Sequence, residues 1–303
     1  MTGSMIHSLK RVLGKNLIAS FYRSLGFLSD KSYIRLIYRL RMGKKLNLDD
    51  PKTFTEKLQW LKLYDHNPNY TRMADKLALR DYVEEKIGSG HSVKVLGVWE
   101  RFSDIDFNTL PDRFVLKTTH DSGSYVIYRD KAEFDFHKAE KILSRSLKYN
   151  YYKTTREWQY KDICPKIIAE EYLDDGKTCL TDYKFFCFNG KPQFMYFEEE
   201  ASNRPTQAIV DMDFNQMPFS MDDEKAEKVP QKPSGFEEME GIAQKLSEGI
   251  PFLRVDMYCI GDTVYVGELT FYHYGGFIPF SPAEWDGRIG DMLDLSMVKG
   301  SDR

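Results

Sequence analysis

Two acidic residues of this 303-residue chain, Asp256 and Glu268, have a spacing that would let them share a metal ion. They lie in segments 252–260 and 263–270, where apolar and polar residues alternate as they do in half-buried strands. Between these segments stands Gly261-Asp262, the clearest hairpin signal in the sequence. We therefore expect the two segments to pair as antiparallel strands.

The length of the turn decides whether the two carboxylates meet. A three-residue loop from Gly261 to Thr263 would pair Asp256 directly with Glu268, whereas a two-residue loop would put them on opposite faces of the sheet. Opposed like charges repel, and a divalent cation between them would offset that repulsion. Carboxylate oxygens on neighbouring strands suit Mg²⁺ that is shared with nucleotide phosphates. We favour this metal site over a solvated carboxylate pair, with Arg254 and Thr270 on the same face.

Two lysines in strand-like segments could hold phosphate groups. Lys117 ends an apolar strand and precedes a small, flexible hairpin whose backbone amides could approach an anion, formed by Ser122, Gly123 and Ser124. Lys184 lies in segment 182–188, where strand alternation puts it on the same face as Asp182. Each feature by itself also fits an ordinary turn or a sheet edge. Together with the acidic pair, they indicate a nucleotide site.

The elements that must position these residues follow from the periodicity of the sequence. A capping box from Thr53 to Glu56 opens one helix, and a second helical stretch begins at Pro68 and ends near Gly88. Strands are expected at 114–118, 125–128, 167–172, 182–188, 193–197, 207–210, 252–260 and 263–270, with helices near 131–149 and 236–248. The stretch 217–235 is expected to be a surface loop. Helices and strands in unequal blocks indicate an α+β fold.

The composition excludes several classes of protein. Hydrophobic residues make up 42% of the chain and charged residues 29%, which is typical of a folded domain and excludes intrinsic disorder. No apolar run approaches the roughly 20 residues that a membrane-spanning helix needs. The cysteines lack the paired spacing of a zinc or disulfide framework, so we expect reduced thiols in a cytoplasmic protein: Cys164, Cys179, Cys187 and Cys259.

The net charge of −3 hides a basic head on an acidic body. Residues 1–46 hold ten basic residues and one acidic residue, while the remainder holds 33 basic and 45 acidic residues. Residues 5–45 interleave these cations with apolar residues at helical spacing, which predicts amphipathic helices. Such helices either lie on an anionic membrane surface or dock on the body of the protein. The acidic body and the lack of a recognition module argue against nucleic-acid binding.

Four stretches of the chain, in this order, resemble the ATP-grasp superfamily, and in particular its TupA-like branch, which is associated with teichuronopeptide and other surface-polysaccharide biosynthesis. They are 114–124, 167–173, 182–190 and 254–276, and residues 47–57 with Asp75-Lys76 also look like that branch. The resemblance implies two α+β lobes that clasp ATP and Mg²⁺ behind a helical N-terminal region. The expected division is a basic amphipathic segment 1–48, a helical region 49–95, a small lobe 96–168 and a large lobe 169–303.

The resemblance also implies where ATP would bind. Lys117 would hold the α- and β-phosphates, beneath a lid made of Ser122, Gly123 and Ser124. The adenine hinge would comprise Glu170, Glu171, Tyr172 and Leu173. Asp182 would lie near the ribose and Lys184 near the triphosphate.

By the same resemblance, Asp256 and Glu268 would hold Mg²⁺ with Thr270, and Arg254 would stabilise the developing anionic centre. Two positions depart from the family pattern. Many ATP-grasp enzymes carry Asn where this chain has Thr270, and the phosphate hairpin more often has Gly where this chain has Asp121. A carboxylate there would repel phosphate, so we expect Asp121 to point away from the site.

ATP-grasp ligases activate a carboxylate as an acyl phosphate, which an amine then attacks to give an amide. For this branch the implied acid is a uronic acid of a surface polysaccharide or its lipid-linked precursor, and the implied amine is an amino acid or another amine. His120 and His273 are candidates to take the amine proton, beside the catalytic Arg254 and Lys184. The acceptor side would include Tyr272, Gly275 and Gly276. The basic head would suit either an anionic glycan or a lipid-linked intermediate at the inner face of the cell membrane.

Three other classes of function compete with the ligase. Asp211-Met212-Asp213 follows an apolar strand and is either a metal-binding DxD motif of a glycosyltransferase or a strand-end turn. A sugar kinase on the same fold would share the ATP half of the site. A non-catalytic binding module is disfavoured, because Lys117, Lys184, Asp256 and Glu268 are all present.

Overall fold

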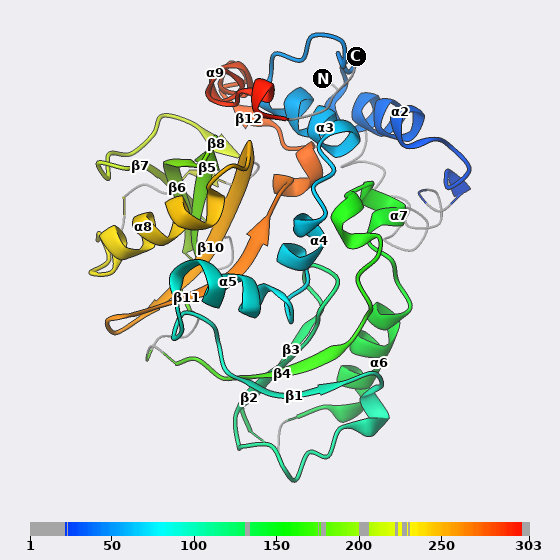
Figure 1. The fold of residues 1–303 in the computed structure, drawn as a ribbon, viewed down its shortest axis with the longest axis vertical. Coiled ribbons are helices and arrows are strands. Elements are labelled where there is room, and N and C mark those ends of the chain that lie inside the picture. Colours follow the sequence, from blue (N-terminus) through cyan, green and yellow to red (C-terminus); the bar gives the residue numbers. More distant parts are fainter. Residues whose placement is uncertain are drawn as a thin grey trace.

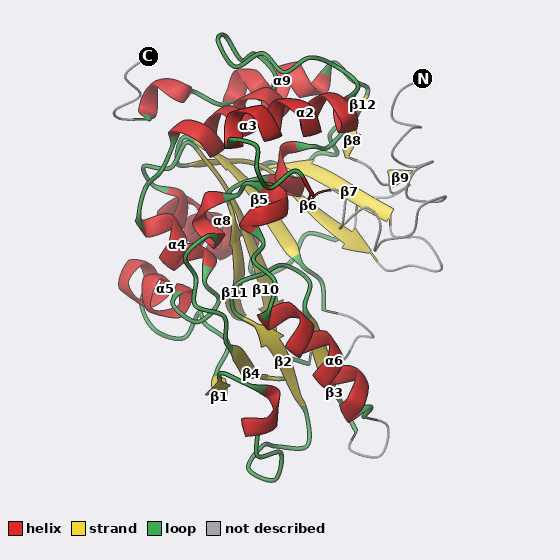
Figure 2. Cartoon of the chain, turned by 90° about the vertical axis from the view of Figure 1, so that its right-hand side faces the viewer, coloured by secondary structure: helices red, strands yellow, loops and turns green. Residues whose placement is uncertain are grey.

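The computed structural model describes residues 22, 24–130, 134–174, 176, 180–199, 206–221, 224–225, 229 and 231–298. These residues form an elongated molecule. A smaller sheet lies at one end, a larger sheet lies in the middle, and helices from both ends of the chain cover the other end (Figure 1, Figure 2). The mixture of sheets and helices confirms the expected α+β fold.

The smaller sheet has four antiparallel strands in the order β1-β4-β2-β3. Their bounds are β1 Val95–Trp99, β2 Phe114–Thr118, β3 Tyr125–Tyr128 and β4 Ile167–Glu171. Helix α6 (Phe136–Leu147) covers one face of this sheet, where its Ala139 and Leu143 share a buried core with Phe114 and Leu116. Burial of this apolar face anchors β2, whose last residues include Lys117.

The larger sheet has the strand order β11-β10-β5-β6-β7-β9, and of these pairs only β7–β9 is parallel. Its strands are β5 Tyr183–Phe188, β6 Lys191–Glu199, β7 Thr206–Asp211, β9 Glu224–Lys225, β10 Phe252–Ile260 and β11 Thr263–Thr270. Helix α8 (Phe236–Ser247) buries Met239, Ala243 and Leu246 in the same core as these strands. Strands β8 (Ser220–Met221) and β12 (Phe280–Ser281) form a separate pair.

The remaining elements are short helices that surround the two sheets. The α-helices are α2 Asp30–Met42, α3 Phe54–Tyr64, α4 Asn69–Ala74, α5 Leu79–Ile87, α7 Tyr152–Thr155 and α9 Trp285–Met292. The 3-10 turns are η1 Phe102–Asp104, η2 Trp158–Tyr160, η3 His273–Gly276 and η4 Leu295–Met297. Helix α3 begins with the expected capping box: Thr53 Oγ1 accepts from Glu56 N at 3.4 Å, and Glu56 Oε2 accepts from Thr53 N at 3.2 Å.

Helix α2 lies within the basic segment and docks on the body of the protein. Its Tyr33, Ile34, Ile37 and Tyr38 are buried with Phe277 of the C-terminal region. For this helix the docking alternative therefore holds. Most of the other amphipathic helix expected in the segment 5–45 lies outside the described residues, at 1–21 and 23. In the part of the chain that is described, no helix has the length and apolar content needed to cross a membrane.

The pattern-based expectations mostly match the observed elements. All eight expected strands are present, and the helix expected near 236–248 is α8. Strand β1 and helix α9 were not expected, and the stretch 217–235 contains the short strands β8 and β9 in addition to loop. The expected lobe boundary after residue 168 falls inside β4, which belongs wholly to the smaller sheet.

Candidate active site

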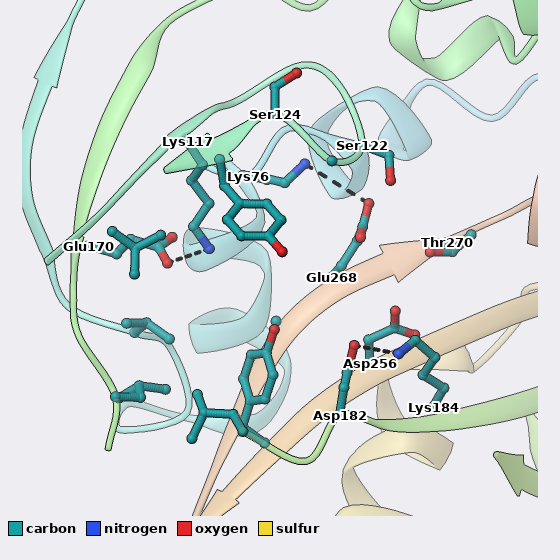
Figure 3. A pocket seen from close by; sticks show the side chains of 18 of the residues that line it. Lys76, Lys117, Ser122, Ser124, Glu170, Asp182, Lys184, Asp256, Glu268 and Thr270 are labelled. Carbon is teal, nitrogen blue, oxygen red and sulfur yellow. Dashed lines mark hydrogen bonds and ion pairs between the residues drawn. The ribbon is translucent and has the colours of Figure 1, made fainter. Parts of the chain in front are cut away.

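A cavity of about 1140 Å³ lies between the two sheets. Both sheets line it, together with the link between α4 and α5, the chain around α7 and η2, and the η3 turn. Most of the predicted site residues contribute to its wall: Lys117, Ser122, Gly123, Ser124, Glu170, Glu171, Tyr172, Leu173, Asp182, Lys184, Arg254, Asp256, Glu268, Thr270, Tyr272 and Gly275. Figure 3 shows ten labelled side chains of this wall. Residues far apart in the sequence therefore converge on one space.

Asp256 of β10 pairs directly with Glu268 of β11, although the expected turn length was wrong. The loop holds two residues, because Ile260 pairs with Thr263, and by itself this loop would put the carboxylates on opposite faces. A β-bulge corrects the register: Met257 pairs with Val266, so Gly267 is an extra residue in β11. The bulge, and not a longer loop, brings the two carboxylates to one face.

Asp256 is held in place by Arg254. The guanidinium donates to both carboxylate oxygens, from Nε to Oδ1 at 2.7 Å and from Nη2 to Oδ2 at 2.5 Å. Burial raises the pKa of Asp256, and the Arg254 charge opposes that shift. Arg254 Nη1 also contacts His273 Nδ1 at 2.6 Å. The pair therefore orients one carboxylate of the predicted metal site.

The donor set fits Mg²⁺ bound together with a nucleotide. Among the described residues, no group of three or more His, Cys, Asp or Glu side chains could hold a metal ion alone. Mg²⁺ in phosphate-transfer sites commonly takes one or two carboxylates, with phosphate oxygens and water as the other ligands. Asp256 and Glu268 would supply those carboxylates. Thr270 Oγ1 is a buried oxygen without a hydrogen-bond partner on the same wall, so it is available as a neutral ligand.

Three lysines reach the cavity, and each lies beside a carboxylate of the wall (Figure 3). Lys117 Nζ is 2.5 Å from Glu170 Oε2, and Lys184 Nζ is 2.5 Å from Asp182 Oδ2. A triphosphate would compete with these carboxylates for the lysines. Lys184 is the strand partner of Asp256, and all three lysines line the same cavity as the Asp256–Glu268 pair. Cations beside two carboxylates suit a polyanion that binds together with Mg²⁺.

Lys76, the third lysine, was not assigned a role from the sequence. It lies in the link between α4 and α5, and its Nζ donates a hydrogen bond to the carbonyl oxygen of Asp121 in the hairpin. The same Nζ is 4.0 Å from Glu268 Oε1. Lys76 therefore joins the hairpin to the predicted metal ligand. The sequence pointed to Lys76 only through the resemblance of Asp75-Lys76 to the family, and that resemblance did not indicate a role for the lysine.

The hairpin after β2 turns its carboxylate away from the cavity, as expected. Asp121 accepts hydrogen bonds from Thr118 Oγ1 at 2.6 Å, from Ser124 Oγ at 2.5 Å and from Ser146 Oγ at 2.7 Å. Ser146 belongs to α6, so these bonds fasten the hairpin to the smaller sheet and its helix. Gly123 has φ +90°, a conformation that side chains rarely adopt. The carboxylate shapes the hairpin instead of facing phosphate.

Three predicted residues lie behind the wall of the cavity. His120 is buried against the end of α6, where Nε2 lies 3.0 Å from the carbonyl oxygens of Ser146 and Tyr149. His273 is fully buried, and burial, helped by the Arg254 and Lys184 charges, lowers its pKa well below the usual range. Gly276 directs its carbonyl oxygen to Gln59 Nε2 at 2.8 Å. The structure does not bring these three residues to the cavity.

A carboxylate missed by the sequence analysis, Glu157, lines the cavity beside Tyr151 and Tyr160. It directly precedes η2 and is 4% exposed. Burial raises its pKa, and the Lys62 charge opposes that shift. No motif surrounds this residue in the sequence, so only the fold reveals its position.

Searches of solved structures found ATP-grasp ligases of low sequence identity. D-alanine–D-alanine ligase from Bacillus anthracis is 17% identical, with 66% of this chain and 57% of that chain covered and a TM-score of 0.39. The enzyme from Helicobacter pylori is 11% identical, with coverages of 82% and 66% and a TM-score of 0.43. The ligase PsnB with Mg and ADP is 9% identical, with coverages of 97% and 74% and a TM-score of 0.43. The chain thus spans less than two thirds of the length of the first of these proteins.

A search of curated proteins found no match to this sequence. A sequence model of the family described as TupA-like ATPgrasp matches residues 56–294, the range that contains both sheets and every cavity residue named above. This match confirms the resemblance to ATP-grasp proteins seen in the sequence. The chain belongs to the TupA-like ATP-grasp family.

Proposed function

We propose that the protein is an ATP- and Mg²⁺-dependent carboxylate–amine ligase that works through an acyl phosphate. The observation that carries the proposal is the pairing of Asp256 with Glu268 in the wall of a cavity that Lys76, Lys117 and Lys184 also line. Two opposed carboxylates with nearby cations suit a metal-bridged triphosphate. Such a site favours phosphoryl transfer, which needs positioning and charge neutralisation and no nucleophilic side chain.

In the first step, a carboxylate oxygen of the acid attacks the γ-phosphorus of ATP, and the bond to the ADP oxygen breaks. Bound Mg²⁺ would neutralise phosphate charge. Lys117 and Lys184 would hold the phosphate oxygens, and Arg254 would keep Asp256 oriented through its two hydrogen bonds. In the second step an amine attacks the acyl carbon, the amide C–N bond forms, and phosphate leaves.

The size of the cavity supports two substrates beside one another. Pockets for single small ligands occupy about 300–1,000 Å³, and this cavity has about 1140 Å³. Its lining changes from the predicted hinge residues near β4 to a set of tyrosines near η2 and η3. We assign the nucleotide to the first region and the acid and amine to the second.

The proposed acid is a uronic acid of a surface polysaccharide or of its lipid-linked precursor, and the proposed amine is an amino acid or related amine. The family assignment supports a surface-polysaccharide role through the resemblance described above. Tyr272, Tyr274 and Gly275 line the acceptor end, where aromatic rings could stack on a sugar face.

The glycosyltransferase alternative has little support from the geometry. Asp211 ends β7, and its carboxylate accepts from Asn215 N at 2.8 Å and from Asn215 Nδ2 at 3.3 Å. These hydrogen bonds are typical of a strand-end turn. Strand β7 lies toward the opposite edge of the larger sheet from β10 and β11. A sugar kinase stays the second candidate, because the nucleotide half of its site would be the same.

We also propose a peripheral contact with anionic membrane through the basic segment 5–45, on the inner face of the cell membrane. The docked face of α2 is apolar, and Lys31, Arg35 and Arg39 are exposed on its other face. Removal of residues 5–28 alone should reduce flotation with vesicles that contain anionic lipid and leave MgATP binding intact. Equal flotation of the truncated and full-length chains would contradict this contact.

The test of the reaction is a screen of uronic acids and amines in which ADP release is measured and products are identified by mass spectrometry. The ligase is supported by ADP release that requires both an acid and an amine, with a new amide of matching mass. ADP release with neutral sugars and no amine would identify a kinase instead.

A further inference from the structure

Glu157 is a buried carboxylate at the acceptor end of the cavity. Glu157 Oε1 is 3.5 Å from the position that a Cβ atom on Gly275 would occupy. Gly275 and Glu157 both line the cavity. The Glu268 charge is close enough to contribute to the raised pKa of Glu157, after burial and the opposing effects of Lys62 and Thr155. The carboxylate therefore lines the same cavity as Gly275 and the predicted metal ligand Glu268.

The backbone around Glu157 is held in an unusual conformation. Arg156, the residue before it, has φ 55°, and Tyr274 on the opposite wall has φ 48°; both values are rare for residues with a side chain. Lys62 Nζ ties the two walls together by donating to Thr155 O at 3.0 Å and to Gly275 O at 2.6 Å. Strained backbone that is held by such contacts is concentrated at functional sites.

Three tyrosines line the cavity together with Glu157: Tyr151, Tyr160 and Tyr272. Burial raises the pKa of each phenol, and the nearby Glu157 charge raises each of them further. All three rings therefore stay neutral near pH 7 and offer aromatic faces beside one carboxylate. Aromatic faces with a carboxylate are the surroundings that an organic ammonium group prefers.

We propose that Glu157 and these tyrosines form the subsite for the ammonium group of the amine substrate, and that Glu157 is the base that deprotonates it. The inference rests on the proposed ligase function and names the residue for the role that the sequence had suggested for His120 and His273. Those histidines are buried behind the wall, whereas Glu157 reaches the cavity.

The proton balance is complete with the groups of this site. The ammonium gives one proton to the Glu157 carboxylate, and the freed amine nitrogen attacks the acyl carbon. The C–N bond forms, the C–O bond to phosphate breaks, and the second amine proton leaves with the phosphate. Glu157 then releases its proton to solvent. A carboxyl whose pKa burial raises to about 7 is well suited to act as a base near neutral pH.

The test measures binding of glycinamide, which carries an ammonium group, and of N-acetylglycinamide, which does not, by NMR titration. We expect the wild type to bind glycinamide preferentially and Glu157→Gln to bind it at least tenfold more weakly. Asp162→Asn, which removes an exposed carboxylate five positions away, is the matched control and should bind like the wild type. If Glu157→Gln fails to fold because Lys62 is left buried without its countercharge, Glu157→Gln with Lys62→Met restores neutrality and should show the same loss.

Thermal stabilisation by MgATP is measured on the same samples. Stabilisation that persists in Glu157→Gln, together with the loss of glycinamide binding, supports the inference. Equal glycinamide binding by the wild type and the folded variants, or equal binding of both probes by the wild type, would overturn it. Absence of MgATP stabilisation in the wild type would count against the proposed ligase function. The glycinamide comparison could still be interpreted in that case, so failure of the ligase proposal can be distinguished from failure of the Glu157 subsite.

Discussion

The backbone of Gly267 lies against the ring of Tyr258, at the β-bulge that aligns Asp256 with Glu268. A Cβ on Gly267 would be 2.8 Å from Tyr258 Cε2, closer than real Cβ contacts. Gly267 is also the extra residue of the β11 bulge, which compensates for the two-residue turn. The predicted metal site therefore depends on a residue that has no side chain.

Substitution of Gly267 by Ala should weaken both the fold and the site. The new methyl group must displace the Tyr258 ring, and overpacking of this kind costs about 1–3 kcal/mol. We expect a lower free energy of unfolding in urea and a smaller stabilisation by MgATP. Gly241→Ala in α8 is the matched control, because a Cβ there has no heavy atom within 4 Å. Identical behaviour of the two variants would show that the bulge does not need glycine.

Lys76→Met should impair the use of MgATP without unfolding the protein. Lys76 connects the hairpin carbonyl of Asp121 to Glu268, so its loss frees the hairpin and removes an ion pair of Glu268. We expect kcat/KM for MgATP to fall by about 10- to 100-fold, a size typical of residues that orient ligands of a metal site. The exposed Lys86→Met in α5 should retain wild-type kinetics. A wild-type kcat/KM in Lys76→Met would remove Lys76 from the site.

Asp256→Asn and Glu268→Gln should each abolish most of the turnover. Each change removes a charge that the metal site needs, and we expect ADP release to fall by at least about 100-fold. Near-native circular dichroism would show that the loss is chemical and not structural. Asp213→Asn changes the DxD pattern and should have no effect on ADP release. A loss confined to Asp213→Asn would favour the glycosyltransferase instead.

The Glu157–Lys62 pair should leave a signature in the pH dependence of stability. Burial raises the pKa of Glu157 from 4.5 to about 7, so between these values the folded protein holds a proton that the unfolded chain has released. Its contribution to the free energy of unfolding therefore falls as pH rises through this window, by roughly 3 kcal/mol at about 1.4 kcal/mol per pKa unit.

Glu157→Gln should flatten this slope. Lys62, whose pKa burial lowers, loses its countercharge in the variant, so its pKa falls further and its contribution to stability then rises with pH. The loss of the Glu157 carboxyl and the lower pKa of Lys62 both make the stability of the variant fall less with rising pH than that of the wild type. Urea unfolding at pH 5 and pH 7 measures the difference between wild type and variant, and a wild-type slope in Glu157→Gln would contradict the buried pair.

Local patterns predicted the strands because short apolar runs with strand-like residues stand between turn signals, and in β2 buried and partly buried residues alternate. Alternation in 252–260 and 263–270 gave correct bounds for β10 and β11. The register was harder to predict, because Gly267 gives no local sign that it forms a bulge; its need for glycine arises from Tyr258 on the neighbouring strand. The correct pairing of Asp256 with Glu268 was thus reached from a wrong turn length.

The positions of site residues that belong to no recognisable sequence pattern could be found only from the three-dimensional structure. Glu157 reaches the cavity only because α7 and η2 pack near η3, which lies more than a hundred positions later in the chain. His120 and His273 are adjacent to site elements in sequence, yet the hydrogen bonds of His120 and the burial of His273 direct them away from the cavity. The sequence therefore identified the correct strands of the site, but closeness to these strands in the sequence did not show which side chains reach the cavity.

The most direct test of the central claim is thermal unfolding with ATP and Mg²⁺ in the wild type and in Glu268→Gln. We predict that ATP with Mg²⁺ raises the Tm of the wild type well above the effect of ATP with EDTA, and that Glu268→Gln loses this difference while keeping the fold. A Tm increase with UDP-sugars but not with MgATP, or an undiminished Mg²⁺ effect in Glu268→Gln, would contradict the account.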